Sequence, residues 1–486
     1  MTRKWWTLAA VVAGVFMLVL DITIVNVALP DIGRDFHSSL SDLQWIIDAY
    51  ALVLAAGLLT AGSLADLFGR RKLYAAGIAL FVLGSLLCGL ATGPAFLVVA
   101  RIVQGLGGTV VYATSLALIG HAFRGEDPKS RGTAFGVYGA VLGIGAALGP
   151  VVGGFLVSGI GWRWIFFINI PVGIAAIVVT LTKVEESRDP ADARLDWRGL
   201  VTFTGALGLL IYGLISSSGG WGVPKVYGSL AGAGVLLAAF LVAEMAERRP
   251  MLDLTLFRKP TFTGGLLAAF GLNASIYSLF TYLVLYLQQE LGYSAAATGV
   301  RFLGLTAPMF VSSTLAGRLT HRVPTRLMIG TGFVLVSAGT WLMYGVSAAS
   351  GWTHLLPGMI VAGLGIGLVT VPLASTAVGV VPVARAGMAS GINLTLRQVG
   401  LSTGIAVLGS IFTARVGIGR AGYAAALNDI LVIGACVALV SAVLSYALIR
   451  RRDFILPQQP APREGGQDSA TAPAALPADP PRSVRG

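Results

Sequence analysis

Three charged residues within long apolar stretches are the first candidates for chemistry in this sequence. Asp21 is the only charged residue between Trp5 and Leu29, and Asp48 and Arg101 interrupt two later apolar runs. A charged side chain in a lipid environment costs a few kcal/mol or more, so such a residue faces a polar interior, a partner or a proton. We interpret the two carboxylates as candidates for proton binding and Arg101 as the cation that tunes them.

The predicted helices place these three groups at a similar depth. Asp21 lies nine residues before Pro30, which is about 13 Å from the outer end of a first helix that runs outward. The same rise per residue puts Asp48 about 8 Å and Arg101 about 10 Å below the outer ends of the second and fourth helices. Burial favours a neutral carboxyl and a nearby cation favours a charged one, so a movement that changes either would load or release a proton. Alternatively, Asp21 and Arg101 form a static ion pair, and Asp48 is merely solvated.

The composition indicates an integral membrane protein. Of the 486 residues, 55% are hydrophobic and only 12% are charged, whereas about 25% are charged in soluble domains. The net charge of +12 could suggest nucleic acid, but the basic residues lie in short loops between apolar runs and form no binding module. We therefore expect the lipid bilayer, and no nucleic acid, as a partner.

The chain contains about fourteen apolar runs of the roughly 20 residues that a helix needs to cross a bilayer. They lie near residues 5–29, 43–65, 73–92, 95–120, 131–157, 164–182, 199–216, 226–245, 262–288, 296–316, 327–347, 353–378, 387–412 and 428–449. If the N-terminus is cytoplasmic, roughly 23 Lys and Arg residues fall in inner loops and about six in outer loops, as the positive-inside rule requires. An even number of spans with both termini cytoplasmic is therefore expected.

An internal repeat predicts the domain organisation. Residues 62–71 follow the second run and residues 317–326 follow the tenth, with the same spacing of Gly and Leu. Aligning them matches runs 1–6 with runs 9–14, which is the repeated-bundle design of many secondary transporters. The expected domains are a six-helix bundle at 5–182, two inserted helices with flanking loops at 183–250, a second six-helix bundle at 251–452 and a disordered cytoplasmic tail at 453–486.

Four stretches resemble the major facilitator superfamily, specifically its fourteen-span drug:proton antiporter family. Residues 20–30 (LDITIVNVALP) are similar to the first-helix signature of that family, and residues 62–71 (GSLADLFGRR) to the loop signature of the superfamily. Residues 101–108 (RIVQGLGG) resemble the fourth-helix signature, and residues 145–154 (GAALGPVVGG) the fifth-helix signature associated with antiporters. The expected fold is therefore all-α, a major facilitator fold with about 14 transmembrane helices arranged as 6+2+6.

The resemblance implies a proton-coupled antiporter, not an enzyme, which exports lipophilic or amphipathic drugs across the cytoplasmic (inner) membrane of a bacterium. The proton gradient would supply the energy, with no cofactor and no metal, and the protein would act as a monomer. The site residues then have four roles: proton coupling, a conformational latch, the antiporter helix motif and the substrate cavity. They are, in that order, Asp21, Asp48 and Arg101; Gly62, Asp66, Gly69, Arg70 and Arg71; Gly145, Gly149, Pro150, Gly153 and Gly154; and Asn26, Gln104, Asn273, Tyr277, Asn393 and Arg397.

Each of these roles has a structural alternative. The basic loop at Arg70 and Arg71 also suits a simple anchor on the inner side, and the glycine run at 145–154 suits ordinary close helix packing. Arg397 could extend its head group to the interface, and the polar cavity candidates could be hydrogen-bonding contacts between helices. Two other functions remain open: export of an endogenous metabolite or lipid, and import of a nutrient with protons.

Overall fold

The computed structural model describes residues 2–124, 128–187, 196–217, 222–246, 254–319, 322–381, 386–416 and 419–454. Within these ranges the regular structure is entirely helical. The predicted tail from residue 453 is described only to Phe454, so its expected disorder lies outside the described residues.

The first bundle contains seven helical segments. They are α1 (Arg3–Phe36), α2 (Leu40–Phe68), α3 (Arg70–Gly89), α4 (Pro94–Ala122), α5 (Pro128–Ile160), α6 (Trp164–Phe167) and α7 (Asn169–Lys183). Local sequence explains several boundaries. Ser39 and Asp42 form a reciprocal capping box at the start of α2, and Pro94 occupies the first turn of α4, where its missing N–H is not needed.

Two further helices, α8 (Trp197–Ser216) and α9 (Pro224–Ala246), pack against each other, and α8 also contacts α2 and α15. The last bundle combines long helices with short 3-10 and π segments. Its segments are η2 (Leu254–Arg258), α10 (Pro260–Leu272), η3 (Asn273–Tyr277), α11 (Ser278–Leu285), η4 (Tyr286–Glu290), α12 (Ala295–Leu319), α13 (Thr325–Leu342), η5 (Trp352–His354), α14 (Leu356–Gly379), α15 (Ala386–Val416), α16 (Gly419–Leu448) and η7 (Arg451–Asp453). Segments α10 to η4 form one candidate span, Pro260–Glu290.

Twelve helices of the described residues are long and apolar enough to cross a membrane, or up to 13 if a bent pair within α5 is one span. The remaining long helix is α13, which is not among them. Every one of the fourteen predicted runs therefore contains a helix, but the count of fourteen spans stays a prediction.

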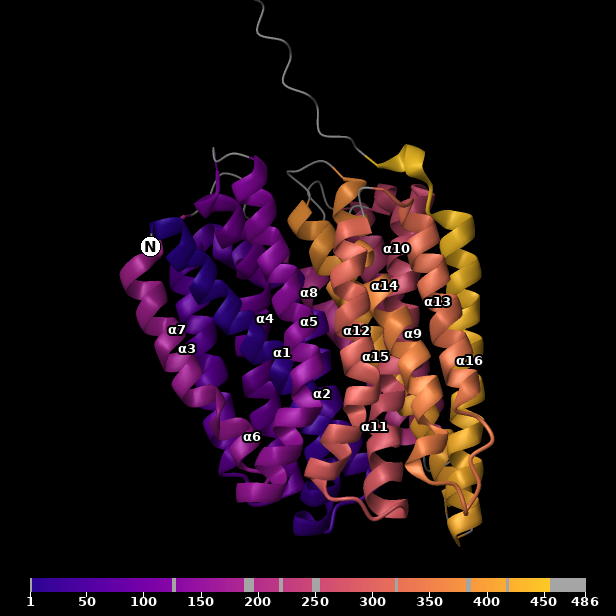
Figure 1. The fold of residues 1–486 in the computed structure, drawn as a ribbon. Coiled ribbons are helices and arrows are strands. Elements are labelled where there is room, and N and C mark those ends of the chain that lie inside the picture. Colours follow the sequence, from indigo (N-terminus) through magenta and orange to yellow (C-terminus); the bar gives the residue numbers. More distant parts are fainter. Residues whose placement is uncertain are drawn as a thin grey trace, which may run out of the picture. The chain divides into compact units, whose positions relative to one another are not determined.

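The helices form two groups that meet along two main pairs. Helices α1 to α7 pack mainly on one another, as do α10 to α16, and the groups meet where α5 packs on α12 and α2 packs on α15. Figure 1 shows the first group in indigo and magenta on the left and the last group in orange and yellow on the right. The start of α1 and the end of α16 lie at the same end of the bundle (Figure 1). Residues of both groups share the largest apolar core cluster.

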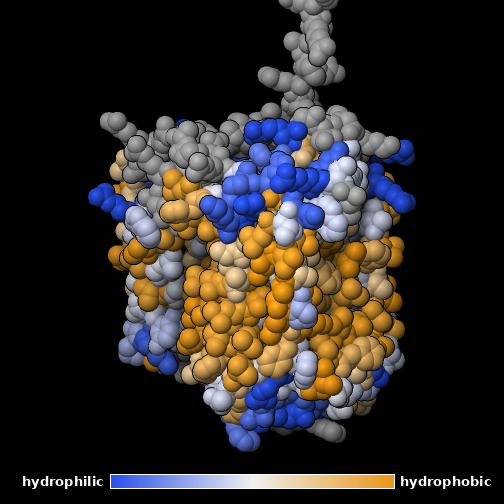
Figure 2. Space-filling view, turned by 90° about the vertical axis from the view of Figure 1, so that its left-hand side faces the viewer, coloured by the Kyte–Doolittle hydropathy of each residue, from blue (hydrophilic) through white to orange (hydrophobic). Residues whose placement is uncertain are grey.

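A broad apolar band covers the face of the bundle that carries α3, α4 and α7. Figure 2 shows this band with hydrophilic residues above and below it. Leu83 and Leu86 of α3, Val99 of α4 and Val178 of α7 are exposed there. Such a continuous apolar surface is suited to lipid chains and not to water.

Candidate functional site

Asp21 and Arg101, which the sequence predicted to meet, form a completely buried ion pair between α1 and α4. The Arg101 Nη1 atom lies 2.5 Å from Asp21 Oδ2, and the two side chains are 1% and 0% exposed. The second carboxylate oxygen, Oδ1, accepts hydrogen bonds from Gln104 Nε2 at 2.8 Å and from Asn169 Nδ2 at 3.1 Å. Three donors from α4 and α7 therefore hold the Asp21 carboxylate.

The partners of Arg101 complete this polar network. Its Nη1 also donates to Gln104 Oε1 at 2.6 Å, its Nε donates to the carbonyl of Ile46 at 3.1 Å, and its guanidinium lies 4.1 Å from the centre of the Tyr50 ring. Gln104 in turn donates to the Ser85 hydroxyl at 2.8 Å. We call Asp21, Ser85, Arg101, Gln104 and Asn169 the Asp21–Arg101 network. It joins α1, α3, α4 and α7 through buried hydrogen bonds, and Arg101 adds α2.

Asp48 does not join this network. It lies two residues from both Ile46 and Tyr50, which face Arg101, and two residues are more than half a turn of an α-helix. Its side chain is 0% exposed, and neither carboxylate oxygen has a hydrogen-bond partner of ordinary geometry among the described residues. The Ser402 hydroxyl of α15 lies close enough to interact with the Asp48 carboxyl. Asp48 is thus a buried acid at the contact between the two helix groups.

The signature loop at 62–71 is tied to the segment that follows α7. Gly69 joins α2 to α3 with a φ of 103°, a conformation that favours glycine. The Glu186 carboxylate accepts hydrogen bonds from the backbone N–H of Arg71 at 2.9 Å and of Lys72 at 3.3 Å, while the N–H of Arg70 donates to the Ser187 carbonyl at 2.8 Å. An acid therefore caps the positive N-terminus of α3, and that acid is Glu186.

Two other predicted latch residues are Asp66 and Gly62. The side chain of Asp66 lies outside the described part of the chain. Gly62 has open space where a side chain would extend, so close packing does not require a glycine there. The latch function of the loop stays a prediction.

The glycine run of α5 packs against one helix of each group. A Cβ atom on Gly149 would lie 1.9 Å from the Thr23 hydroxyl of α1, and one on Gly153 would lie 2.7 Å from the Ile24 side chain; Gly145 also faces α1, at Val19. On the other side, a Cβ on Gly154 would lie 2.4 Å from the Ala295 carbonyl of α12.

The neighbouring turn of α5 makes a second close approach to α12. A Cβ atom on Gly299 of α12 would lie 2.3 Å from the carbonyl oxygen of Pro150. Two glycines, one from each helix, therefore allow backbone contact between the groups, as small residues do in membrane helices.

The predicted cavity residues separate into four environments. Gln104 is fully buried in the Asp21–Arg101 network, and Asn273 donates to the Ala269 carbonyl of its own helix at 2.9 Å. Asn26 accepts a hydrogen bond from Thr281 at 2.9 Å, which links α1 to α11. The remaining three are Tyr277, Asn393 and Arg397, which lie in the interior where the two groups face each other.

Sequence reasoning missed four residues of these contacts: Ser85, Asn169, Tyr50 and Glu186. Asn169 had a usable signal, because it is a polar residue inside an apolar run. The other three carry no such signal, since a serine, a tyrosine or a loop glutamate is ordinary at those places.

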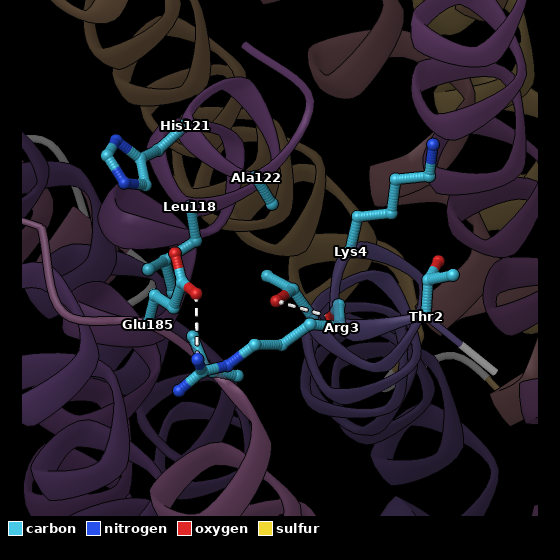
Figure 3. A pocket seen from close by; sticks show the side chains of 9 residues that line it. Thr2, Arg3, Lys4, Leu118, His121, Ala122 and Glu185 are labelled. Atoms are coloured by element: carbon cyan, nitrogen blue, oxygen red, sulfur yellow. Dashed lines mark hydrogen bonds and ion pairs between the residues drawn. The ribbon is translucent and has the colours of Figure 1, made fainter. Parts of the chain in front are cut away.

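A pocket of about 330 Å³ lies at the beginning of α1, far along the helix from Asp21. Figure 3 shows the Arg3 and Glu185 side chains pointing toward one another there, and their ion pair measures 2.8 Å. Both side chains are 59% exposed, and exposed pairs of this kind contribute little to stability. The pocket is lined by α1, α4 and residues 184–185 only, so it is not placed between the two helix groups.

In the described part of the chain, no three His, Cys, Asp or Glu residues cluster as metal ligands could.

Comparison with known proteins identifies the class of this protein. The model of the Major Facilitator Superfamily matches residues 11–405. The chain therefore belongs to that superfamily and is a multi-pass membrane transporter. The crystal structure of the human organic anion transporter MFSD10 (TETRAN) has the same fold, with a TM-score of 0.65, 14% sequence identity and coverage of 92% of this chain and 100% of that chain.

Several curated bacterial relatives are similar over most of the chain. The multidrug resistance protein Stp of Mycobacterium tuberculosis is 39% identical over 409 residues, which are 84% of this chain and 76% of that protein. The tetracenomycin C resistance and export protein of Streptomyces glaucescens is 36% identical and spans 85% of this chain and 77% of that protein. The puromycin resistance protein pur8 of Streptomyces alboniger is 37% identical and spans 85% of this chain and 82% of that protein. These relatives are multidrug and antibiotic resistance proteins.

Proposed function

We propose that this protein is a proton-coupled antiporter that exports lipophilic or amphipathic drugs or antibiotics across the bacterial cytoplasmic membrane. The observation that carries the proposal is the similarity to Stp, to the tetracenomycin C exporter and to the puromycin resistance protein, each at 36% identity or more over at least 84% of this chain. The proposed topology has fourteen spans as 6+2+6 with both termini cytoplasmic. The start of α1 and the end of α16 lie at the same end of the bundle, which supports an even number of spans (Figure 1).

Transport would proceed by alternating access, with the two helix groups rocking about a site between them. Hydrogen bonds between the groups support this: Gln44 donates to the Tyr282 hydroxyl at 3.3 Å and to the Ile405 carbonyl at 3.2 Å, and Gln288 donates to the Val27 carbonyl at 2.9 Å. These bonds lie near the start of α2 and the end of η4, which is the outer side in the proposed topology. The described arrangement is then closed toward the outside.

Asp48 is the acid that we expect to exchange the proton. A charged carboxylate without hydrogen bonds in a dry interior is costly, so the closed contact between α2 and α15 favours the neutral acid. Separation of the two helices would admit water and allow the proton to leave. Asp21 would instead stay held within the Asp21–Arg101 network, because its two oxygens accept hydrogen bonds from three donors.

The test uses energised inside-out vesicles and a pH-sensitive dye, to which puromycin, tetracenomycin C, a lipophilic cation or a sugar is added. We expect a drug, and not the sugar, to dissipate the proton gradient with the wild-type protein. Asp48→Asn should reduce the initial rate by about a hundredfold or more, the loss typical of a removed proton-transfer group. Asp42→Asn is the matched control, because Asp42 lies on the same helix but only caps its start.

Two results would contradict this proposal in different ways. If no drug dissipates the gradient with the wild-type protein, drug export is refuted and a narrow metabolite exporter takes its place. If Asp48→Asn responds like the wild type, drug export stands but the proton site is not Asp48, and Asp21 is tested next.

A further inference from the structure

Among the residues that the structure describes, Arg397 is a cation in the interior of the bundle that has no anionic partner. It lies on α15, and its Nε and Nη2 atoms are shielded from solvent without any hydrogen-bond partner among the described residues. In that part of the chain it also forms no ion pair, in contrast to Arg101, which pairs with Asp21. The residue as a whole is partly exposed.

Asn393 adds another unused donor on the same face of α15. It lies four residues before Arg397, and side chains four apart are neighbours along an α-helix. Its side chain is only 5% exposed, and its Nδ2 atom has no hydrogen-bond partner among the described residues. The nearby Thr395 donates to the Ala55 carbonyl of α2 at 2.9 Å, which fixes this part of α15 against the other helix group.

Three tyrosines from three other segments lie within electrostatic range of the Arg397 guanidinium. They are Tyr112 of α4, Tyr138 of α5 and Tyr277 of the π segment η3. Two come from the first helix group and one from the last, so the cluster lies between the groups. A π segment inside an α-helix is frequent at functional sites, and this one places Tyr277 at the cluster.

The cluster combines the two features that an aromatic acid requires. A guanidinium presents a planar fork that matches a carboxylate with two parallel hydrogen bonds, and Asn393 supplies a further N–H. Tyrosine side chains offer ring faces for an aromatic body. A buried charge without a partner is unfavourable, so an anionic ligand would relieve that cost, whereas a cationic ligand would increase it.

We propose that Arg397 and Asn393, together with Tyr112, Tyr138 and Tyr277, form the subsite that binds the acidic group of an amphipathic aromatic anion. The proposal rests on the export function proposed above and names its substrate class: aromatic carboxylates and comparably acidic compounds, in preference to organic cations.

The experiment measures direct binding to the purified full-length protein in detergent, by energy transfer from tryptophan to a pyrene probe. The probes are 1-pyrenebutyrate, its uncharged methyl ester and a pyrenebutyl trimethylammonium ion. We expect the wild-type protein to bind the carboxylate about tenfold more tightly than the ester, because hydrogen bonds to a charged group contribute roughly that factor. The ammonium compound should bind more weakly than the ester.

The variants assign this preference to the subsite. Arg397→Gln should bind acid and ester equally, Arg397→Lys should keep part of the preference without the planar fork, and Asn393→Ala should reduce it. Arg301→Gln is the matched control, since Arg301 stacks 3.7 Å from the Tyr293 ring and donates to the Ala297 carbonyl. Size-exclusion profiles show which variants fold. If Arg397→Gln does not fold, the binding preferences of Arg397→Lys and Asn393→Ala decide whether the subsite is correctly assigned.

The proposal is overturned if the wild type binds acid and ester equally, if it prefers the ammonium compound, or if the Arg397 variants keep the full preference. Its failure is separable from that of the export function, because binding in detergent needs no proton gradient. A preserved preference for the acid without drug-driven proton movement in vesicles refutes antiport alone. Drug-driven proton movement in vesicles without a preference for the acid in detergent refutes the anion subsite alone.

Discussion

Replacing Asp21 with asparagine tests whether the Asp21–Arg101 network is a structural element. The substitution keeps the shape of the side chain but leaves Arg101, which is 1% exposed, without a counter-charge. It also leaves a single acceptor oxygen for the three donors that previously shared the two carboxylate oxygens. Removing one member of a buried ion pair costs about 3–5 kcal/mol, so we expect Asp21→Asn to lower the free energy of unfolding by that amount.

The double variant Asp21→Asn/Arg101→Gln separates the charge from the packing. It removes both charges at once, so no unpaired ion remains, and it should be more stable than Asp21→Asn alone. Coupling of residues in contact typically amounts to about 0.5–3 kcal/mol, and we expect the upper part of that range here because both charges are buried.

The assay is denaturation by increasing mole fraction of sodium dodecyl sulfate in mixed micelles, followed by tryptophan fluorescence and checked for reversibility. Asp42→Asn serves as the control at an acid near the surface. The reasoning is refuted if the free energy of unfolding of Asp21→Asn lies within about 1 kcal/mol of the wild-type value, because removing one charge of a buried ion pair is strongly destabilising. It is also refuted if the double variant is less stable than the sum of the two single changes.

Two glycine substitutions test the close contacts in the same vesicle and denaturation assays. Gly154→Ala should slow drug-driven proton movement severalfold, because its Cβ would lie 2.4 Å from the Ala295 carbonyl on the other helix group. The control is Gly159→Ala, which has open space around it and should keep the wild-type rate. Equal rates for the two variants would show that the contact at Gly154 does not matter for rocking. Gly69→Ala should lower the free energy of unfolding by about 1–2 kcal/mol, the cost of a left-handed backbone for a residue with a Cβ, with Gly93→Ala as the control in open space. An unchanged stability of Gly69→Ala would contradict the assignment of backbone strain to its positive φ.

Much of the fold follows from local pattern. Apolar runs of about 20 residues predict spanning helices, because backbone groups in lipid must be satisfied within a helix. Each predicted run contains a helix in the structure, and Arg101 was expected beside Asp21 because both interrupt apolar runs at a similar depth. Boundaries were less predictable: the stretch Pro260–Glu290 contains two π segments, and their insertion depends on packing that no local pattern describes.

Sequence alone predicts a helical membrane protein with charged groups buried at its centre, because hydrophobic length and charge position are properties of the chain alone. The partners of those groups become known only from the packing of the folded bundle. Asp48 lies two residues from the helix face that contacts Arg101, and its side chain therefore faces α15. The acid that caps the start of α3 is Glu186, more than 100 residues away along the chain. Partnership depends on helix rotation and on which helices are neighbours, and these are set by the packing of the whole bundle.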